Sequence, residues 1–187
     1  MASSYSTDLK LELMVTGENS GTWGDKTNTN LNLVQQAIAG YEEVSIAGGA
    51  QTTALAMSDA TLSNARNAVI KFTGTITGNQ IVTVPDGIEK TYTFINGTTG
   101  AFTVQVKTAS GTGFTFAAAD KGTRLAYADG TNLVDVNAAF TTINQFTLPT
   151  ADGTADQAIL TDGSGNLSFG DAGISTGKAI AMAIVFG

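Results

Sequence analysis

The 187-residue sequence contains no histidine, no cysteine, only two prolines and few charges of either sign. Without imidazoles or thiols it has no imidazole general base, no cysteine nucleophile, no zinc site of the usual ligands and no disulfide framework. Charged side chains make up 13% of the residues, against roughly 25% in ordinary soluble domains. The formal net charge of −7 opposes binding to a nucleic-acid backbone, which depends on lysine and arginine. These absences favour contacts with other protein chains over catalysis.

Targeting and membrane signals are also missing from the sequence. Residues 1–6 have neither the basic region nor the apolar region of a secretory signal. The longest apolar run, residues 179–186, is far shorter than the ~20 residues of a membrane-spanning helix. We therefore expect a protein that is made in a cytoplasm without a signal peptide, does not insert into membranes and leaves the cell by another route, such as lysis.

The first segment begins with a strand-like alternation. Leu9, Leu11 and Leu13 alternate with the polar residues Lys10 and Glu12, which is a period of two. Turn-forming residues then interrupt the alternation before Trp23. We predict a flat, extended arm in this part of the chain.

A short amphipathic helix is predicted to follow the arm. The apolar residues with helical spacing are Leu31, Val34 and Ile38. Asn28 or Asn30 is a suitable N-cap, and Gly40 is expected to end the helix in a left-handed conformation. Two interpretations of Trp23, the single tryptophan, remain open. It is either a local anchor that packs on the helix, as the burial of most tryptophans favours, or a docking plug for another protein.

The middle segment, residues 41–140, is predicted to be strand after strand. The alternating runs are residues 43–46, 53–57, 68–72, 81–84, 91–95, 102–107, 113–116, 123–128 and 133–136. The turn signals between them are residues 78–79, 85–87, 96–97, 110–111 and 129–130. Asn-Gly and Asp-Gly between alternating runs are the strongest short-range hairpin signals. We therefore predict an antiparallel β-sandwich of about a hundred residues.

The last segment, residues 141–187, is rich in short strands and Asp-Gly turns, and it has too few apolar residues to hold a core alone. Such a segment becomes stable when equivalent segments of other chains pack around one axis. An exposed, uncharged apolar tip would be an aggregation hazard. We therefore predict a subunit or partner interface, whose residues are Ile180, Met182, Ile184 and Phe186.

Candidate chemistry is weak throughout. Glu42 and Glu43 are adjacent, so in a strand they point to opposite faces. Residues 162–166 resemble a calcium loop but lack its alternating acidic ligands and closing glutamate, so a hairpin turn is favoured. Residues 111–113 lack the helix and lysine of a phosphate loop. The four tyrosines are a candidate sugar-stacking surface or, more commonly, packing residues. We predict no catalytic, cofactor-binding or metal-binding residues and no enzyme activity.

Several motifs together resemble one protein family. The longest are residues 5–14 (YSTDLKLELM) and 16–24 (TGENSGTWG). Further motifs are residues 26–31, 38–41, 64–67, 84–85, 90–92, 96–100, 106–111 and 129–135. These resemble the tail-fibre-like proteins of tailed bacteriophages, marine and cyanobacterial ones included. Residues 148–154 and 161–169 resemble a segment that is common in phage fibre shafts.

The resemblance implies a non-enzymatic, trimeric virion protein whose N-terminal part attaches to the particle. An extended arm also suits docking to a partner by strand addition. The residues that we expect to carry this docking are Leu9, Leu11, Leu13 and Trp23. Long fibres continue into a receptor-binding tip, so the resemblance leaves open a short fibre, an adaptor for another fibre protein or a fibre on the head.

The sequence thus predicts a mainly β protein in three parts. They are an arm and helix for virion attachment (residues 1–40), a sandwich (41–140) and a trimerisation or docking segment (141–187). The expected function is a structural one, as a short tail fibre or fibre adaptor that contributes to host attachment. The alternatives are a capsid decoration, cement or head-fibre protein and, less favoured, a carbohydrate-binding or glycan-degrading module. The expected partners are other copies of the chain, other virion proteins and, as a further candidate, a host surface glycan.

Overall fold

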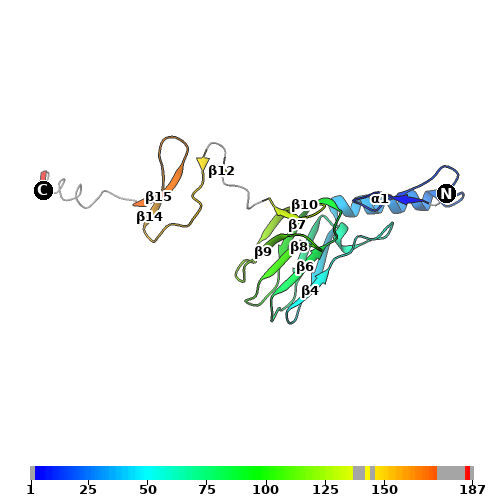
Figure 1. The fold of residues 1–187 in the computed structure, drawn as a ribbon, viewed down its shortest axis with the longest axis horizontal. Coiled ribbons are helices and arrows are strands. Elements are labelled where there is room, and N and C mark those ends of the chain that lie inside the picture. Colours follow the sequence, from blue (N-terminus) through cyan, green and yellow to red (C-terminus); the bar gives the residue numbers. More distant parts are fainter. Residues whose placement is uncertain (1–2, 137–141, 144–145, 172–183, 186–187) are drawn as a thin grey trace. The chain divides into compact units, whose positions relative to one another are not determined.

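A computed structural model describes residues 3–136, 142–143, 146–171 and 184–185 (Figure 1). The chain divides into two compact units, Met1–Asn137 and Ala138–Gly187, and each is described by itself. Most of the regular structure in the described residues is β-strand, as predicted.

The first unit holds two helices and the strands of two larger sheets. Its elements are α1 (Trp23–Ala39), the 3-10 helix η1 (Asn64–Arg66), β1 (Ser4–Tyr5), β2 (Glu12–Leu13), β3 (Tyr41–Ser45), β4 (Gln51–Ala54), β5 (Val69–Thr73), β6 (Gln80–Val84), β7 (Glu89–Asn96), β8 (Val104–Thr108), β9 (Gly113–Phe116), β10 (Thr123–Asp129) and β11 (Leu133–Asp135). Each strand predicted in the middle segment overlaps one of β3 to β11, which confirms those local predictions.

Strands β3 to β11 form two sheets over one core. The five-stranded sheet has the order β11-β10-β7-β5-β3, and the four-stranded sheet has the order β4-β6-β8-β9. The two sheets form separate layers in Figure 1. Buried side chains from both sheets belong to a single hydrophobic cluster. The sheets therefore pack face to face and bury one face each.

The chain winds through these sheets in three successive turns of a spiral, which we call coils. The coils are β3 with β4, β5 with β6, and β7 with β8. β3, β5 and β7 run parallel in the larger sheet, and β4, β6 and β8 run parallel in the smaller one. Each coil therefore gives one strand to each sheet. Antiparallel pairs follow at the other end, where β10 pairs with β7 and β11, and β9 pairs with β8. The prediction of antiparallel pairing is wrong for the three coils.

The pairing differs because turn residues serve two purposes in this chain. Residues 78–79 and 96–97 carry the chain from the larger sheet to the smaller one, and residues 85–87 carry it back. They are therefore corners between sheets rather than hairpins. Residues 110–111 and 129–130 join antiparallel neighbours, as predicted. The same Asn-Gly and Asp-Gly chemistry suits both kinds of turn, so it does not distinguish them.

The corners from the larger sheet to the smaller one share a backbone feature. Gly48, Gly74 and Gly100 have φ angles of 109°, 101° and 103°, a region that side chains with a Cβ rarely adopt. They stand at equal intervals in the sequence, one in each coil. A Cβ added to Gly100 would lie 2.2 Å from the main-chain oxygen of Ile76 in the preceding coil. The glycines therefore permit both the sharp corner and the close stacking of coils.

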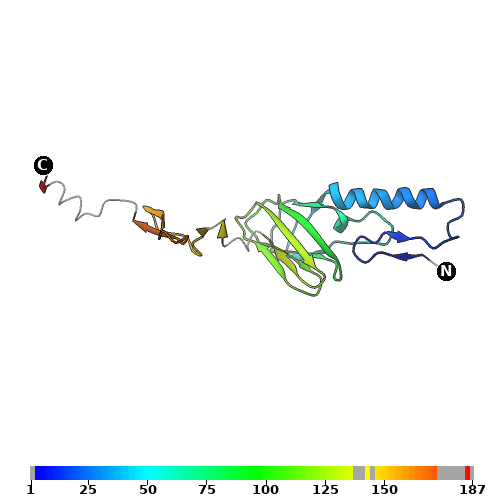
Figure 2. The same ribbon diagram turned by 90° about the horizontal axis from the view of Figure 1, so that it is seen from above.

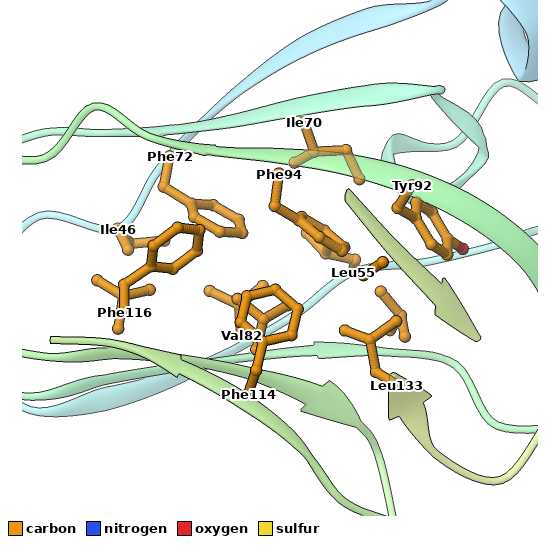
Figure 3. Packing of buried hydrophobic residues seen from close by; sticks show 14 of the residues in the cluster. Ile46, Leu55, Ile70, Phe72, Val82, Tyr92, Phe94, Phe114, Phe116 and Leu133 are labelled. Atoms are coloured by element: carbon orange, nitrogen blue, oxygen red, sulfur yellow. The ribbon is translucent and has the colours of Figure 1, made fainter. Parts of the chain in front are cut away.

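Aromatic side chains fill the core between the sheets (Figure 3). In the larger sheet the rings of Phe72 and Phe94 stack at 5.8 Å, and those of Tyr92 and Phe94 at 5.2 Å. In the smaller sheet Phe114 and Phe116 meet edge to face at 5.4 Å. Burying a phenylalanine side chain contributes about 1.5–3 kcal/mol. This aromatic core is therefore a major source of stability for the first unit.

The N-terminal arm is folded back rather than extended, so that part of the prediction is wrong. β1 pairs antiparallel with β2, and Lys10 in the connection has a φ of 53°. The main-chain N–H of Ser6 donates to the oxygen of Leu11 at 2.9 Å, and the N–H of Leu11 donates to Ser6 Oγ at 2.9 Å. The alternating leucines indicate local strand geometry, but the polar groups of the connection close it into a hairpin.

The helix α1 lies beside this hairpin (Figure 2). It begins at Trp23, so Asn28 and Asn30 lie inside it and do not cap it. Gly40 follows the helix with φ −70° and ψ 137°, so the predicted left-handed ending is wrong. A Cβ at Gly40 would lie 2.2 Å from the main-chain oxygen of Gln36. Close packing, and not backbone conformation, therefore explains this glycine.

The described residues of the second unit form short two-stranded pairs. β12 (Thr142–Ile143) pairs with β13 (Phe146–Thr147), and β14 (Gln157–Thr161) pairs with β15 (Leu167–Asp171). Asp162 Oδ1 accepts the main-chain N–H groups of Ser164 and Asn166 at 2.8 and 3.0 Å in the turn between β14 and β15. The predicted hairpin turn is therefore confirmed.

Candidate functional site

A buried arginine holds the base of the N-terminal arm. Arg66 in η1 is fully buried. Its guanidinium donates to the main-chain oxygens of Leu9 at 3.0 Å, of Ser58 at 2.7 Å and of Thr61. It also donates to Gln36 Oε1 of α1 at 3.3 Å. Burial lowers the pKa of Arg66, yet an arginine stays protonated in proteins. One cation therefore connects the arm, the helix and the loop before η1.

A second polar cluster joins the arm to the middle of α1. The Glu12 carboxylate pairs with Lys26 Nζ at 3.0 Å and accepts from Ser3 Oγ at 3.0 Å. The Asn30 side chain accepts from the Glu12 N–H at 2.9 Å and donates to the Glu12 main-chain oxygen at 2.8 Å. Lys26, assisted by Ser3, lowers the pKa of Glu12. Polar contacts thus fix the arm along the helix.

The arm and α1 together, residues 3–39, are called the extension from here on. The four predicted docking residues are distributed along it. Leu9 and Leu11 are partly buried, and Leu9 lies at the base, because its main-chain oxygen accepts from Arg66. Leu13 and Trp23 are 50% and 65% exposed. Trp23 begins α1, so it lies about 24 Å along the helix axis from the end that leads into β3. The four side chains therefore do not gather into one patch, and Leu13 and Trp23 are the accessible pair.

The exposure of Trp23 bears on its two interpretations. A local anchor that packs on the helix would be largely covered, whereas Trp23 is 65% exposed. It is the first residue of α1 rather than a residue between arm and helix. The local-anchor interpretation is therefore disfavoured, and the docking interpretation stays a prediction.

The predicted C-terminal interface falls largely beyond the structure. Ile180, Met182 and Phe186 lie outside the described residues. Ile184 is described and is 78% exposed. The assignment of these four residues to an interface stays a prediction.

The outer surface of the five-stranded sheet carries several large apolar side chains among threonines and charged residues. Strand alternation turns one set of side chains away from the core, and strand register places them side by side. The apolar members, which we call the five-strand face, are Tyr41, Val69, Ile95, Leu125, Tyr127 and Val134. Tyr41 and Val134 are 52% and 47% exposed. Within the face, Glu43 accepts from Tyr41 Oη at 2.6 Å and pairs with Lys71 at 3.0 Å.

The outer surface of the four-stranded sheet differs in chemistry. Its outward residues, which we call the four-strand face, are Thr52, Ala54, Ile81, Thr83, Gln105, Lys107, Gly113 and Thr115. Ile81 is the large apolar member, and it is partly buried. Polar side chains are typical of a sheet face that is turned to water, and of these residues Thr83 is buried. The two outer faces of the same unit therefore differ in how many large apolar side chains they carry.

The described part of the second unit buries no side chain fully. None of residues 146–171 is buried. In the β14–β15 hairpin, Ile159 is 58% exposed and Leu160 is 43% exposed, and neighbouring residues of a strand point to opposite faces. Both faces of the hairpin therefore offer apolar side chains to solvent or to a partner.

The described residues contain no group of three or more carboxylates, histidines or cysteines that could hold a metal ion. The Glu43 carboxylate forms an ion pair with Lys71. Lys90 is nearly buried and donates to the main-chain oxygens of Asn67 at 3.1 Å and Thr91 at 3.0 Å. Burial lowers the pKa of Lys90 to about 8. These contacts give Lys90 a structural role beside the core.

The tyrosines do not form one sugar-stacking surface. Tyr92 is fully buried in the core, and burial raises the pKa of its hydroxyl. Tyr41 and Tyr127 belong to the five-strand face, whereas Tyr5 lies in β1. The tyrosines are therefore divided between the core, the arm and an outer face.

The sequence predictions include neither the buried arginine nor the five-strand face. Arg66 is the sole charged residue between Asp59 and Lys71, and a lone charge in an uncharged stretch is a usable signal for a buried cation. The five-strand face depends on the register of non-neighbouring strands, which the sequence pattern does not indicate.

Comparison with protein-family models, with curated proteins and with solved structures returns no match. Within the described part of the chain, no helix has the length and apolar character that crossing a membrane requires.

Proposed function

We propose that this chain is a structural component of a bacteriophage virion, a short tail fibre or fibre adaptor that attaches to the particle and contributes to host attachment. It acts without catalysis and as a homotrimer. The proposal is supported by the resemblance of residues 5–14 and 16–24 to phage tail-fibre-like proteins. The structural observation that supports it most is the arm-and-helix extension, which has a fixed base and an exposed Leu13 and Trp23.

A docking extension needs a rigid base and an accessible contact. Arg66 fixes the base by hydrogen bonds to Leu9 and Gln36, and Glu12 fixes the middle by its ion pair with Lys26. Trp23 adds a large exposed ring at the far end of α1. Tryptophan is the residue most enriched at the energetic centres of protein interfaces, together with tyrosine and arginine. The extension therefore has the parts that attachment to a particle requires.

The body of the first unit suits a particle protein for a different reason. Outside a cell such a protein must resist unfolding without disulfides, and this chain has no cysteine. The coils close a continuous core between two sheets. A homotrimer would also cover the edge strands that a single chain leaves open.

Incorporation into particles tests the proposal. In a phage that encodes this chain, the native copy is replaced by the double variant Leu13→Ser, Trp23→Ser. The matched control is Leu62→Ser, because Leu62 is 64% exposed but lies outside the extension. We expect purified particles to contain the wild type and the control, and to contain less than a tenth as much of the double variant, by quantitative mass spectrometry.

Electron cryo-microscopy of the same particles separates the alternatives. Density on the tail supports the fibre or adaptor, and density on the head supports the decoration, cement or head-fibre alternative. Absence of the wild-type chain from purified particles would contradict a virion role. Equal incorporation of the double variant and the wild type would contradict the docking residues. Binding or cleavage of host polysaccharide by particle-free protein would favour the carbohydrate-binding alternative.

A further inference from the structure

We infer that the Asp152-Gly153 pair is a site of spontaneous modification, at which the main-chain nitrogen of Gly153 closes a succinimide ring on the Asp152 carboxyl group and water then opens this ring to isoaspartate. The reaction needs no enzyme and no cofactor. The inference goes beyond the proposed function and does not depend on it, because it rests on the geometry of this one connection in the second unit.

The step is a condensation within the main chain. The nitrogen of Gly153 attacks Cγ of the protonated Asp152 side chain, the N–Cγ bond forms, and the hydroxyl group leaves with the amide hydrogen as water. A water molecule from the solvent then opens the ring at either carbonyl carbon, and no oxidant or reductant takes part. Opening at the main-chain carbonyl gives isoaspartate, in which the chain continues through Cγ and is longer by one carbon atom.

The structure holds the two reacting groups together. The N–H of Gly153 donates to Asp152 Oδ1 at 2.9 Å, which brings the nitrogen next to the carboxyl carbon that it attacks. Within the described part of the chain, the Asp152 carboxylate accepts no other hydrogen bond, and its exposure lets water reach the ring. Intramolecular reactions gain most in rate when the reacting atoms are held about 3–3.5 Å apart.

Neighbouring side chains fix Gly153 in this position. A Cβ added to Gly153 would lie 2.6 Å from Cγ of Phe169 in β15, so the main chain of Gly153 lies directly against that ring. The next N–H, that of Thr154, donates to Gln157 Oε1 at 2.8 Å. The attacking nitrogen is therefore held by contacts on both sides of it, and the missing side chain of Gly153 leaves its approach to the carboxyl group unhindered.

Four further pairs in the sequence have the same local chemistry, and the structure restrains each of them. They are Asp86-Gly87, Asn96-Gly97, Asp129-Gly130 and Asp162-Gly163. In three of these pairs the glycine N–H donates to another residue, at 2.7 Å for Gly87, 2.9 Å for Gly97 and 3.1 Å for Gly163. Each bond fixes the peptide group in an orientation that differs from the one at Gly153.

The carboxyl groups of two of these pairs are restrained as well. Asp129 Oδ1 accepts the N–H groups of Thr131 and Asn132 at 2.8 and 2.6 Å, and Asp162 Oδ1 accepts two N–H groups of its own turn. The N–H groups of Asn132 and Thr131 lower the pKa of Asp129, and the side chain of Asn166, followed by main-chain donors, lowers the pKa of Asp162. Both carboxyls therefore stay ionised, and an ionised carboxylate is the poorer electrophile.

Isoaspartate formation at the four Asp-Gly pairs of the full chain tests the inference. The purified wild type is incubated warm at neutral pH and digested, and the peptides are analysed by chromatography with electron-based fragmentation, which distinguishes isoaspartate from aspartate. We expect isoaspartate to form about tenfold faster at Asp152 than at Asp86, Asp129 or Asp162. In guanidinium chloride, which removes the fold, the four rates should become similar.

Substitutions around Asp162 test whether the surrounding contacts set the rate. The double variant Thr161→Val, Asn166→Ala removes the acceptor of the Gly163 N–H and a side-chain donor to Asp162, and it keeps the Asp-Gly pair itself. Thr161 and Asn166 are exposed. We expect isoaspartate at Asp162 to form several-fold faster in this variant, with the rate at Asp152 unchanged. Asp152→Glu is the control for the assignment, because its longer side chain would have to close a six-membered ring and the isoaspartate signal of this peptide should disappear.

Several outcomes would overturn the inference. They are equal rates at the four Asp-Gly pairs of the folded wild type, faster formation at a restrained pair than at Asp152, or a difference between the pairs that persists in guanidinium chloride. An unchanged rate at Asp162 in the double variant would show that the contacts do not set the rates, which also contradicts the inference. Particle incorporation is measured separately, so each of these outcomes leaves the virion role standing.

Discussion

The two units of this chain have similar amino acids but are built in different ways. The first unit closes two sheets over a core in which Phe72, Phe94 and Phe116 are fully buried. In the second unit none of the described residues 146–171 is buried, and its main element is a two-stranded hairpin. Such hairpins are marginally stable in water by themselves. The first unit therefore supports its own fold, whereas the second requires contacts that its described residues do not supply.

The difference lies in how the strands are combined rather than in their local chemistry. Asp129-Gly130 and Asp162-Gly163 each close a hairpin. The strand before the first turn, β10, also pairs with β7 of the coils. Among the described residues, the strands around the second turn form a two-stranded sheet of their own, and a single bridge between Thr147 and Asn166 joins this hairpin to β13. A hairpin that joins a larger sheet gains a buried face, and a hairpin alone does not.

Truncating one phenylalanine in each unit should give the largest difference in stability between the two units. Phe94→Ala removes a ring that contacts Phe72, Tyr92 and Phe114, and we expect it to lower the free energy of unfolding by about 3–5 kcal/mol. Phe169→Ala in β15 should leave the transition of the first unit unchanged. Urea unfolding followed by circular dichroism measures both effects. A large effect of Phe169→Ala on that transition would show that the second unit packs against the core-bearing one.

The sequence predicts where the strands of the first unit lie better than it predicts which strands pair with each other. Alternation is local, so runs such as residues 113–116 and 123–128 could be placed from the sequence and are found in β9 and β10. Pairing is not local, because residues 96–97 form a corner and residues 129–130 form a hairpin with similar chemistry. The regular interval of Gly48, Gly74 and Gly100 is the signal that would have indicated stacked coils.

Removing the buried arginine should separate the extension from the body. Arg66→Ala leaves the main-chain oxygens of Leu9, Ser58 and Thr61 without their donor. We expect a loss of about 3 kcal/mol, because hydrogen bonds to a buried charged group are costly to break. Arg66→Lys is the control, since it keeps the charge and loses the planar fork, and it should recover part of the loss.

Hydrogen exchange locates the effect of Arg66→Ala. Amides of residues 4–13 should exchange much faster in the variant, while those of β5 and β7 keep most of their protection. Equal loss of protection in the arm and the core strands would contradict a separate role for Arg66 at the base of the extension.

The candidate docking residues show why a site is harder to predict than a strand. Leu9, Leu11 and Leu13 share one alternation, yet the arm folds back and leaves Leu13 more exposed than the other two. The main chain of the arm is held by Arg66 at Leu9 and by Asn30 at Glu12, and both of these side chains lie far away in the sequence. A local pattern cannot indicate which members of an alternation a distant side chain will cover.

Glycine substitutions should give a smaller contrast between the units. Gly100 has a φ of 103° and lies close to the preceding coil, so Gly100→Ala combines backbone strain with a steric clash and should cost about 2 kcal/mol. Gly163 has a φ of 77°, and nothing lies within 4 Å of an added Cβ. Gly163→Ala should therefore leave the urea transition of the first unit unchanged. An equal shift from both variants would contradict the stacking of coils at Gly100.

Acid should act on the polar extension before it acts on the apolar body, with the smallest effect of the four. Lys26 and Ser3 lower the pKa of Glu12 in the folded chain, so the stabilisation by this carboxylate is present above the ordinary value of about 4.3 and is lost as the pH falls through the lower folded value. Arm amides should lose protection from hydrogen exchange in that range, while amides of β7 stay protected. Glu12→Gln should reproduce the loosened arm at neutral pH and weaken its pH dependence, of which Glu18, whose pKa is lowered by Ser3, keeps a part. Arm protection that is the same in the variant and the wild type at neutral pH would mean that the Glu12 carboxylate does not hold the arm.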